Sequence, residues 1–137
     1  MLANDITISG TLRYNKMIGN VTNVTGTKYL EDAAYYVNIN NSSNTAFDVF
    51  LPQDNLTEGQ TIFINCGNGR FNLRAVNKDI KYFFKQPVTT SDGSLNTATH
   101  YEIWPGTYTA GSSTGINAYD AGWNGVVEFI YTGEYWQ

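Results

Sequence analysis

The chain of 137 residues has little charge, one cysteine and no long hydrophobic run. Charged residues make up 15% of it and the formal net charge is -4, whereas disordered proteins combine high net charge with few aromatic residues. No apolar stretch approaches the ~18 residues of a transmembrane helix. The first residues also lack the basic and apolar regions of a secretory signal. These absences predict a soluble, folded protein that does not interact with membranes.

Residues that carry enzyme chemistry are scarce as well. Cys66 and His100 are the single cysteine and the single histidine, which excludes an intramolecular disulfide and the usual zinc sites. The two could form a nucleophile and base, but Cys66 ends an apolar strand, a place more typical of a buried structural thiol. Phosphate-binding, dinucleotide-binding and Gly-x-Ser-x-Gly motifs are absent. We therefore predict a protein without catalytic activity, cofactor or metal.

Two alternatives that use carboxylates stay open. A small glycoside hydrolase needs two carboxylates that flank one sugar bond, and the chain has twelve acids, but no spacing selects a pair. A calcium site needs several oxygens that converge on one loop. The segment that comes closest to such a loop contains Asp120, with Asn117 and Asn124 nearby.

Positive charge is missing from the last third of the chain. All eight Lys and Arg residues lie in residues 1–85, while residues 86–137 hold five acids and no basic residue. The ordinary interpretation is a solvated acidic face. The alternative is a C-terminal surface that meets a basic partner or the chain's own basic neighbour, Arg70 to Lys85. The sequence pI of about 4.7 argues against nucleic acid as the main partner, because phosphate binding requires a basic face.

The residues that are abundant favour strands and turns. Aromatic residues make up 15% of the chain, and there are sixteen Asn, sixteen Thr and seven Ser. Thr and aromatic side chains favour β-strands, while Asn, Ser and Gly favour turns. Short alternating runs separated by turn residues occupy residues 6–14, 35–39, 47–51, 61–65, 71–76, 80–84, 101–104 and 125–131. This pattern predicts an all-β fold with eight or nine short strands, arranged as a jelly-roll-like antiparallel β-sandwich.

The Gly67-Asn68-Gly69 turn signal predicts a hairpin over residues 60–76. Before the main strands, residues 15–33 are polar. We predict that residues 1–33 form an extended attachment arm and that residues 34–137 form the β-sandwich domain. The candidate attachment residues are the apolar side chains of the arm's first strand: Ile6, Ile8, Leu12 and Tyr14.

Aromatic residues on a Gly-rich segment give the main binding signal. Residues 105–125 form a long loop in which Tyr108, Tyr119 and Trp123 are the candidate ligand or interface residues. Such rings combine apolar area with a polar tip, so they stack on sugars or anchor interfaces. Long loops in compact domains are commonly functional. Trp104 and Trp136, by contrast, are expected to fill the core or seal its end.

The segment from Tyr35 to Asn65 has a recognisable order. An aromatic strand, Tyr35-Tyr36-Val37-Asn38-Ile39, is followed by a strand that closes on Leu51-Pro52, and then by Gly59-Gln60-Thr61-Ile62-Phe63-Ile64. The chain ends in Gly133-Glu134-Tyr135-Trp136-Gln137. This order resembles the small β-sandwich modules of tailed-phage virion surfaces, in which a Leu-Pro strand end, a Gly-x-x-Ile-x-Ile strand and a final Gly-x-x-Trp recur. The resemblance covers about a third of the chain.

The resemblance implies a homotrimer on the exterior of a virion. Fibre tips follow a long shaft, and this chain contains no heptad or collagen-like repeat. The expected function is therefore that of a capsid decoration protein or short head fibre, which binds the major capsid protein or another virion protein through its N-terminal part. The alternative is a receptor-binding tip or carbohydrate-binding module that binds a host surface glycan through its loop aromatics.

Overall fold

A computed structural model describes residues 6–16, 18–87 and 101–137. The described residues form strands and no helix, which confirms the all-β prediction. They therefore include no helix that could span a membrane. The strands are β1 (Val21–Val24), β2 (Lys28–Tyr29), β3 (Tyr36–Ile39), β4 (Phe47–Phe50), β5 (Thr61–Asn65), β6 (Phe71–Arg74), β7 (Ile80–Pro87), β8 (Tyr101–Tyr108), β9 (Ile116–Asn117) and β10 (Val126–Ile130).

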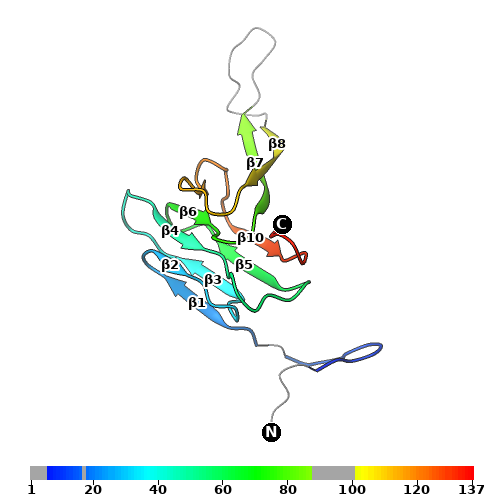
Figure 1. The fold of residues 1–137 in the computed structure, drawn as a ribbon. Helices are drawn as coiled ribbons and strands as arrows, with labels where there is room; N and C mark the ends of the chain where they lie inside the picture. Colours follow the sequence, from blue (N-terminus) through cyan, green and yellow to red (C-terminus); the bar gives the residue numbers. More distant parts are fainter. Residues whose placement is uncertain (1–5, 17, 88–100) are drawn as a thin grey trace.

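Strands of the first half alternate between two four-stranded sheets (Figure 1). One sheet has the order β1–β3–β5–β10 and the other β2–β4–β6–β9. Pairing is parallel within β1–β3–β5 and within β2–β4–β6. Each pair of consecutive strands therefore makes one coil of chain, and three coils stack on one another. At the far end of the stack, β10 pairs with β5 and β9 with β6, both antiparallel.

The core lies between these two sheets. Alternate side chains of each strand point inward, because neighbouring residues of a strand face opposite sides of its sheet. Val37 and Ile39 of β3 are fully buried, and so are Phe71 and Leu73 of β6. Buried residues of both sheets belong to a single hydrophobic cluster. The alternation visible in the sequence thus places one face of each strand in a shared core.

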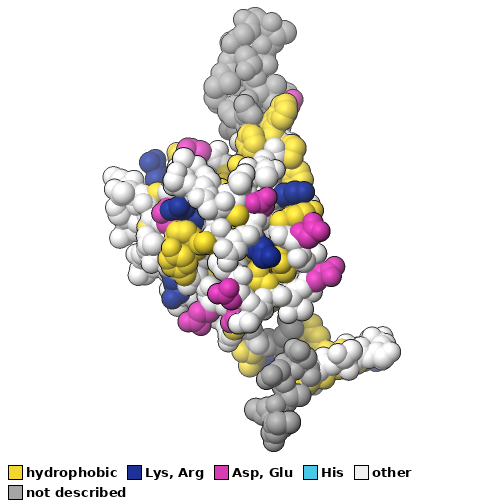
Figure 2. All heavy atoms as spheres, viewed as in Figure 1, with side chains coloured by type: hydrophobic (Ala, Val, Ile, Leu, Met, Phe, Trp, Pro, Cys, Tyr) yellow, Lys and Arg dark blue, Asp and Glu magenta, His cyan; other side chains and the backbone are white. Residues whose placement is uncertain are grey.

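Strands β7 and β8 form a separate antiparallel ribbon that projects from the coil stack, on the side away from the N-terminal segment (Figure 1). Hydrophobic side chains gather along this ribbon in Figure 2. Among them, Trp104 is 46% exposed and Ile103 is 64% exposed. The expectation that Trp104 fills the core is therefore wrong, because β8 lies at the outer edge of a two-stranded ribbon.

The C-terminal segment closes the stack against β7. The backbone N–H of Lys81 donates to the Trp136 carbonyl at 2.8 Å, and that of Lys85 donates to the Ala121 carbonyl at 2.9 Å. Trp136 is fully buried, packs against Tyr131 at 5.5 Å between ring centroids, and donates its indole N–H to the Pro52 carbonyl. The expectation that Trp136 belongs to the core is confirmed.

Two features of the predicted topology are wrong. The sheets are mixed and not antiparallel, because every pairing among the three coils is parallel. The predicted hairpin over residues 60–76 does not form, since β5 pairs with β3 and β10 while β6 pairs with β4 and β9. Gly69, at φ +117°, takes the chain from one sheet to the other. The observed strand pairings therefore do not confirm the predicted jelly-roll arrangement.

The number and position of strands differ at the N-terminus as well. The described residues hold ten strands, two of them only two residues long, and not eight or nine. Residues 6–16 contain no strand, so the predicted first strand is absent. Within the segment predicted as an arm, β1 and β2 pair into the sheets, while residues 6–16 extend away from them (Figure 1).

Candidate functional site

Tyr119 and Trp123 lie around one hollow, which has a volume of about 550 Å³. Three stretches of chain line the hollow: residues 41–44 after β3, the turn from Cys66 to Arg70, and the loop after β9. They meet because β9 pairs with β6, which brings the loop back beside the start of β6. The structure thus brings together two of the three aromatic residues predicted from the sequence.

Tyr108, the third of these residues, does not line the hollow. It ends β8 with a side chain that is 5% exposed. Its hydroxyl lies 2.8 Å from the carbonyl oxygen of Ser112 and 3.2 Å from that of Ala75. Tyr108 therefore anchors the loop that follows β8, and its ring is part of the core.

Trp123 forms a fixed wall of the hollow. Its indole N–H donates to the Phe83 carbonyl at 2.8 Å, and its ring makes edge contacts with Tyr82 and Phe129, each at 5.8 Å between centroids. The neighbouring part of β8 contains Pro105, which pairs with Phe83 and has no backbone N–H to donate. Because its only donor is already used, Trp123 offers a ligand apolar ring surface and no hydrogen bond.

Tyr119 stands free beside this wall, with 64% of its surface exposed. The loop beneath it is fixed, because the Asn117 side-chain oxygen accepts the backbone N–H groups of Tyr119 and Asp120 at 3.0 and 3.2 Å. The Arg70 guanidinium carbon lies 4.6 Å from the centre of the Tyr119 ring, a cation–π distance. A solvent-facing ring and a guanidinium are thereby presented together.

Residues 41–44 and Arg70 were not predicted as site residues from the sequence, yet hydrogen bonds connect them. The side-chain amide of Asn41 donates to the carbonyls of Arg70 at 2.6 Å and Thr45 at 2.9 Å, and its oxygen accepts the Ser43 N–H at 2.9 Å. A Cβ at Gly69 would collide with the Asn41 carbonyl. A turn-rich Asn-Ser-Ser-Asn segment and an Arg beside Gly-Asn-Gly were the available signals, but only parallel stacking of the coils brings them together.

Cys66, in the same wall, is unsuited to nucleophilic chemistry. It is 6% exposed, and burial raises the pKa of its thiol from 9.0 to about 12. The thiol is therefore protonated at neutral pH, whereas attack requires the thiolate. His100, its candidate base, lies outside the described residues. No group of His, Cys, Asp and Glu side chains that could hold a metal ion occurs within the described part of the chain.

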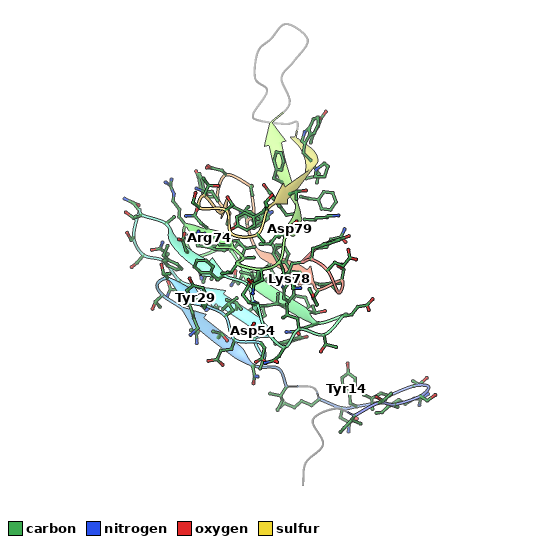
Figure 3. The ribbon with its side chains drawn as sticks, in the orientation of Figure 1. Tyr14, Tyr29, Asp54, Arg74, Lys78 and Asp79 are labelled. Carbon is green, nitrogen blue, oxygen red and sulfur yellow. The ribbon has the colours of Figure 1, made fainter. Side chains whose placement is uncertain are left out.

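The predicted attachment residues lie on a segment that stands away from the body. Ile6, Ile8, Leu12 and Tyr14 are 82%, 50%, 58% and 60% exposed. In Figure 3, Tyr14 lies on this segment at a distance from the sheets. From here on, the arm means residues 6–16 together with Ile18. Its Ile18 is 81% exposed as well.

The coil from which the arm leaves has two open strand edges. In the described part of the structure, β1 pairs only with β3, and β2 pairs only with β4. Two rows of side chains run along the stack and end at this coil. In the first row, Asn65 donates to the Asn38 side-chain oxygen at 3.1 Å, and Asn38 donates to that of Asn23 at 3.3 Å. Within the described residues, Asn23 therefore ends this row of asparagines.

The second row is aromatic. The rings of Tyr29 and Phe50 stack at 4.0 Å with an interplanar angle of 5°, and the Arg74 guanidinium lies 4.9 Å from the Phe50 ring. Tyr29 and Arg74 lie on the same side of the body in Figure 3. Asp48 fixes Arg74 through a 2.9 Å ion pair, and this hydrogen bond raises the pKa of the guanidinium further. The outer face of Tyr29, which is 62% exposed, ends this row at the same coil.

Comparisons with protein-family models, with curated proteins and with solved structures found no match for this chain.

Proposed function

We propose that this protein is a non-enzymatic structural protein of a viral particle, held on the particle surface through its N-terminal end. The observation that supports this proposal is the open coil, where the β1 edge, Asn23 and Tyr29 are uncovered beside the apolar arm. An edge strand has free backbone N–H and C=O groups that pair with a strand of another chain. The function proposed is attachment by contact alone, without a cofactor or a chemical step.

The arm supplies apolar surface for this attachment. Its four aliphatic side chains, Ile6, Ile8, Leu12 and Ile18, are each at least half exposed. Burial of one such side chain contributes ~1.5–3 kcal/mol, so burial of several of them offsets part of the free-energy cost of association. Clusters of large apolar side chains on a surface mark places where another protein binds.

The partner that fits this end is a subunit of the particle, a major capsid protein or another virion protein with an accessible strand edge. The proposal includes the homotrimer that the resemblance to phage surface modules implies. It also includes the sandwich part of the predicted fold: the two four-stranded sheets serve as its two layers, although their connections differ from those of an antiparallel jelly roll.

Sedimentation of the purified chain, followed by incubation with particles that lack it, tests the proposal. We expect a species of three times the 15.3 kDa chain mass that co-sediments with the particles. Replacing Ile6, Ile8 and Leu12 with Ser removes the apolar contacts of the arm. This variant should fold normally and lose co-sedimentation.

The matched control is Ile103→Ser, which removes an equally exposed aliphatic side chain from the β7–β8 ribbon and leaves the arm intact. It should bind particles like the unmodified chain. A monomeric protein that does not bind particles would overturn the proposal, and so would an arm variant that binds with unchanged affinity.

A further inference from the structure

We propose that the hollow bounded by Tyr119, Trp123 and Arg70 binds a carboxylated sugar. Its volume of about 550 Å³ lies within the ~300–1,000 Å³ that small-molecule sites occupy. None of the residues that line it belongs to the arm or to the open coil. The ligand site is therefore independent of the attachment proposed above.

The charge of the hollow selects an acidic ligand. Arg70 is the only charged residue that lines it, and within the described residues Arg70 forms no ion pair. Its guanidinium carbon lies 4.6 Å from the centre of the Tyr119 ring, and its side chain forms no hydrogen bond to another described residue, so its N–H groups are available for a ligand. A guanidinium edge matches the two oxygens of a carboxylate and forms paired, charge-assisted hydrogen bonds with them.

The aromatic residues select a ring-shaped ligand with apolar C–H faces. Tyr119 is 64% exposed, so it can cover one face of a sugar ring, and its hydroxyl is a hydrogen-bonding group at the rim. Trp123 is held by Phe83, Tyr82 and Phe129 and provides a rigid apolar wall. The two rings do not form one flat platform, because only Tyr119 projects into solvent.

Free polar groups surround these rings. Ser42, Asn44 and Asn124 line the hollow, and within the described structure their side chains form no hydrogen bond. Hydroxyl and amide groups both donate and accept, as sugar hydroxyls require. The backbone of Arg70 is held in place, since its carbonyl accepts the Asn41 amide at 2.6 Å. A fixed site loses less conformational entropy on binding than a mobile one does.

Isothermal titration calorimetry with matched probes tests the proposal on the full chain. The probes are 3′-sialyllactose with lactose as its neutral counterpart, and trigalacturonic acid with its methyl ester. We expect at least one of the two acids to bind more tightly than its neutral counterpart. Arg70→Gln should weaken binding of that acid at least about tenfold, the size of a lost charge-assisted hydrogen bond.

Further variants separate the roles of the side chains. Arg70→Lys keeps the charge but not the paired geometry, so it should bind the acid with intermediate affinity. Tyr119→Ala should weaken binding more than Tyr119→Phe, which keeps the ring. Arg13→Gln removes an exposed arginine of the arm and should leave binding of the acidic sugar unchanged.

The proposal is overturned if neither acid binds, if each acid and its neutral counterpart bind equally, or if Arg70→Gln binds the acid as tightly as the unmodified chain does. Binding of a polyglutamate peptide without binding of either acidic sugar also overturns it. Particle binding can fail in the arm variant while these titrations are unaffected, so failure of this proposal and failure of the attachment proposal are distinguishable.

Discussion

The two ends of the coil stack are finished in different ways. At one end, β9 and β10 reverse direction and pair antiparallel, and the chain terminus places Trp136 in the core beside Ile80. At the other end, β1 and β2 have no partner on their outer edges within the described structure, and the arm leaves with its apolar side chains exposed. Stacked coils need caps at both ends because each coil buries only what its neighbours cover. The closed end therefore supplies stability, and the open end is available for contact.

The largest loss of stability is expected from shortening a buried side chain at the closed end. Trp136→Ala removes a fully buried ring and its hydrogen bond to Pro52, so the free energy of unfolding should fall by ~3–5 kcal/mol. Urea denaturation followed by circular dichroism measures this loss. The matched control, Trp104→Ala, removes a ring that is 46% exposed and should cost far less. Similar losses in the two variants would mean that the closed end does not dominate stability.

The thiol at the end of β5 gives a pH-dependent test of the same end. Burial raises the pKa of Cys66 from 9.0 to about 12, and its backbone N–H donates to Gly125 just before β10. Below about pH 9 the thiol is protonated in both the folded and the unfolded chain, so it does not lower the free energy of unfolding there. Between about pH 9 and 12 the unfolded chain loses the thiol proton while the folded chain keeps it. The free energy of unfolding should then fall by about 1.4 kcal/mol per pH unit from this group.

Urea denaturation at several pH values from about 8 to 10.5 measures this slope. Cys66→Ala lacks the thiol and should show a shallower fall, because every other ionisable side chain is the same in the two proteins. Equal slopes would show that water reaches the thiol and that this end is less closed than described.

The row of asparagines connects the two ends and should show a graded effect. Asn38 lies in the middle of the row and makes two of its hydrogen bonds, whereas Asn23 at the open end makes one. Asn38→Ala should lower the free energy of unfolding by ~1–2 kcal/mol, and Asn23→Ala by less than ~1 kcal/mol. Thermal or urea denaturation of both variants checks the order. The reverse order would indicate that the row does not run through the stack as described.

The smallest effect on stability is expected at the arm. Ile8→Ser changes a side chain that is already half exposed, so the free energy of unfolding should change by less than ~0.5 kcal/mol. The same substitution should weaken attachment to particles, measured by co-sedimentation. A clear loss of stability would place Ile8 in the folded body and remove the contrast between the two ends.

The sequence located most strands but not their partners. The alternating runs at residues 35–39, 47–51 and 61–65 correspond to β3, β4 and β5. Alternation specifies which face of a strand is buried, and that face is the same for a parallel and an antiparallel neighbour. The Gly67-Asn68-Gly69 turn predicted a hairpin, yet the Asn68 carbonyl accepts the Asn41 N–H from the previous coil at 2.8 Å. A local turn signal did not reveal this contact between coils.

The candidate site was predicted only in its aromatic part. Tyr119 and Trp123 were found because aromatic residues on a Gly-rich loop are unusual for a core. Tyr108 shares that composition but is buried, since it ends a strand that returns to the body. Arg70 and Asn41 were missed because they are 29 residues apart in the sequence and meet only through the stacking of successive coils.

Composition and alternation by themselves determined an all-β chain and the position of most strands. Only the tertiary structure decided which strands are neighbours, which of Trp104 and Trp136 is buried, and which charged residue meets Tyr119. The physical reason is that strand propensity and side-chain alternation depend on residues close in sequence. Pairing, burial and the assembly of a site depend on contacts between distant residues, which form only when the coils stack.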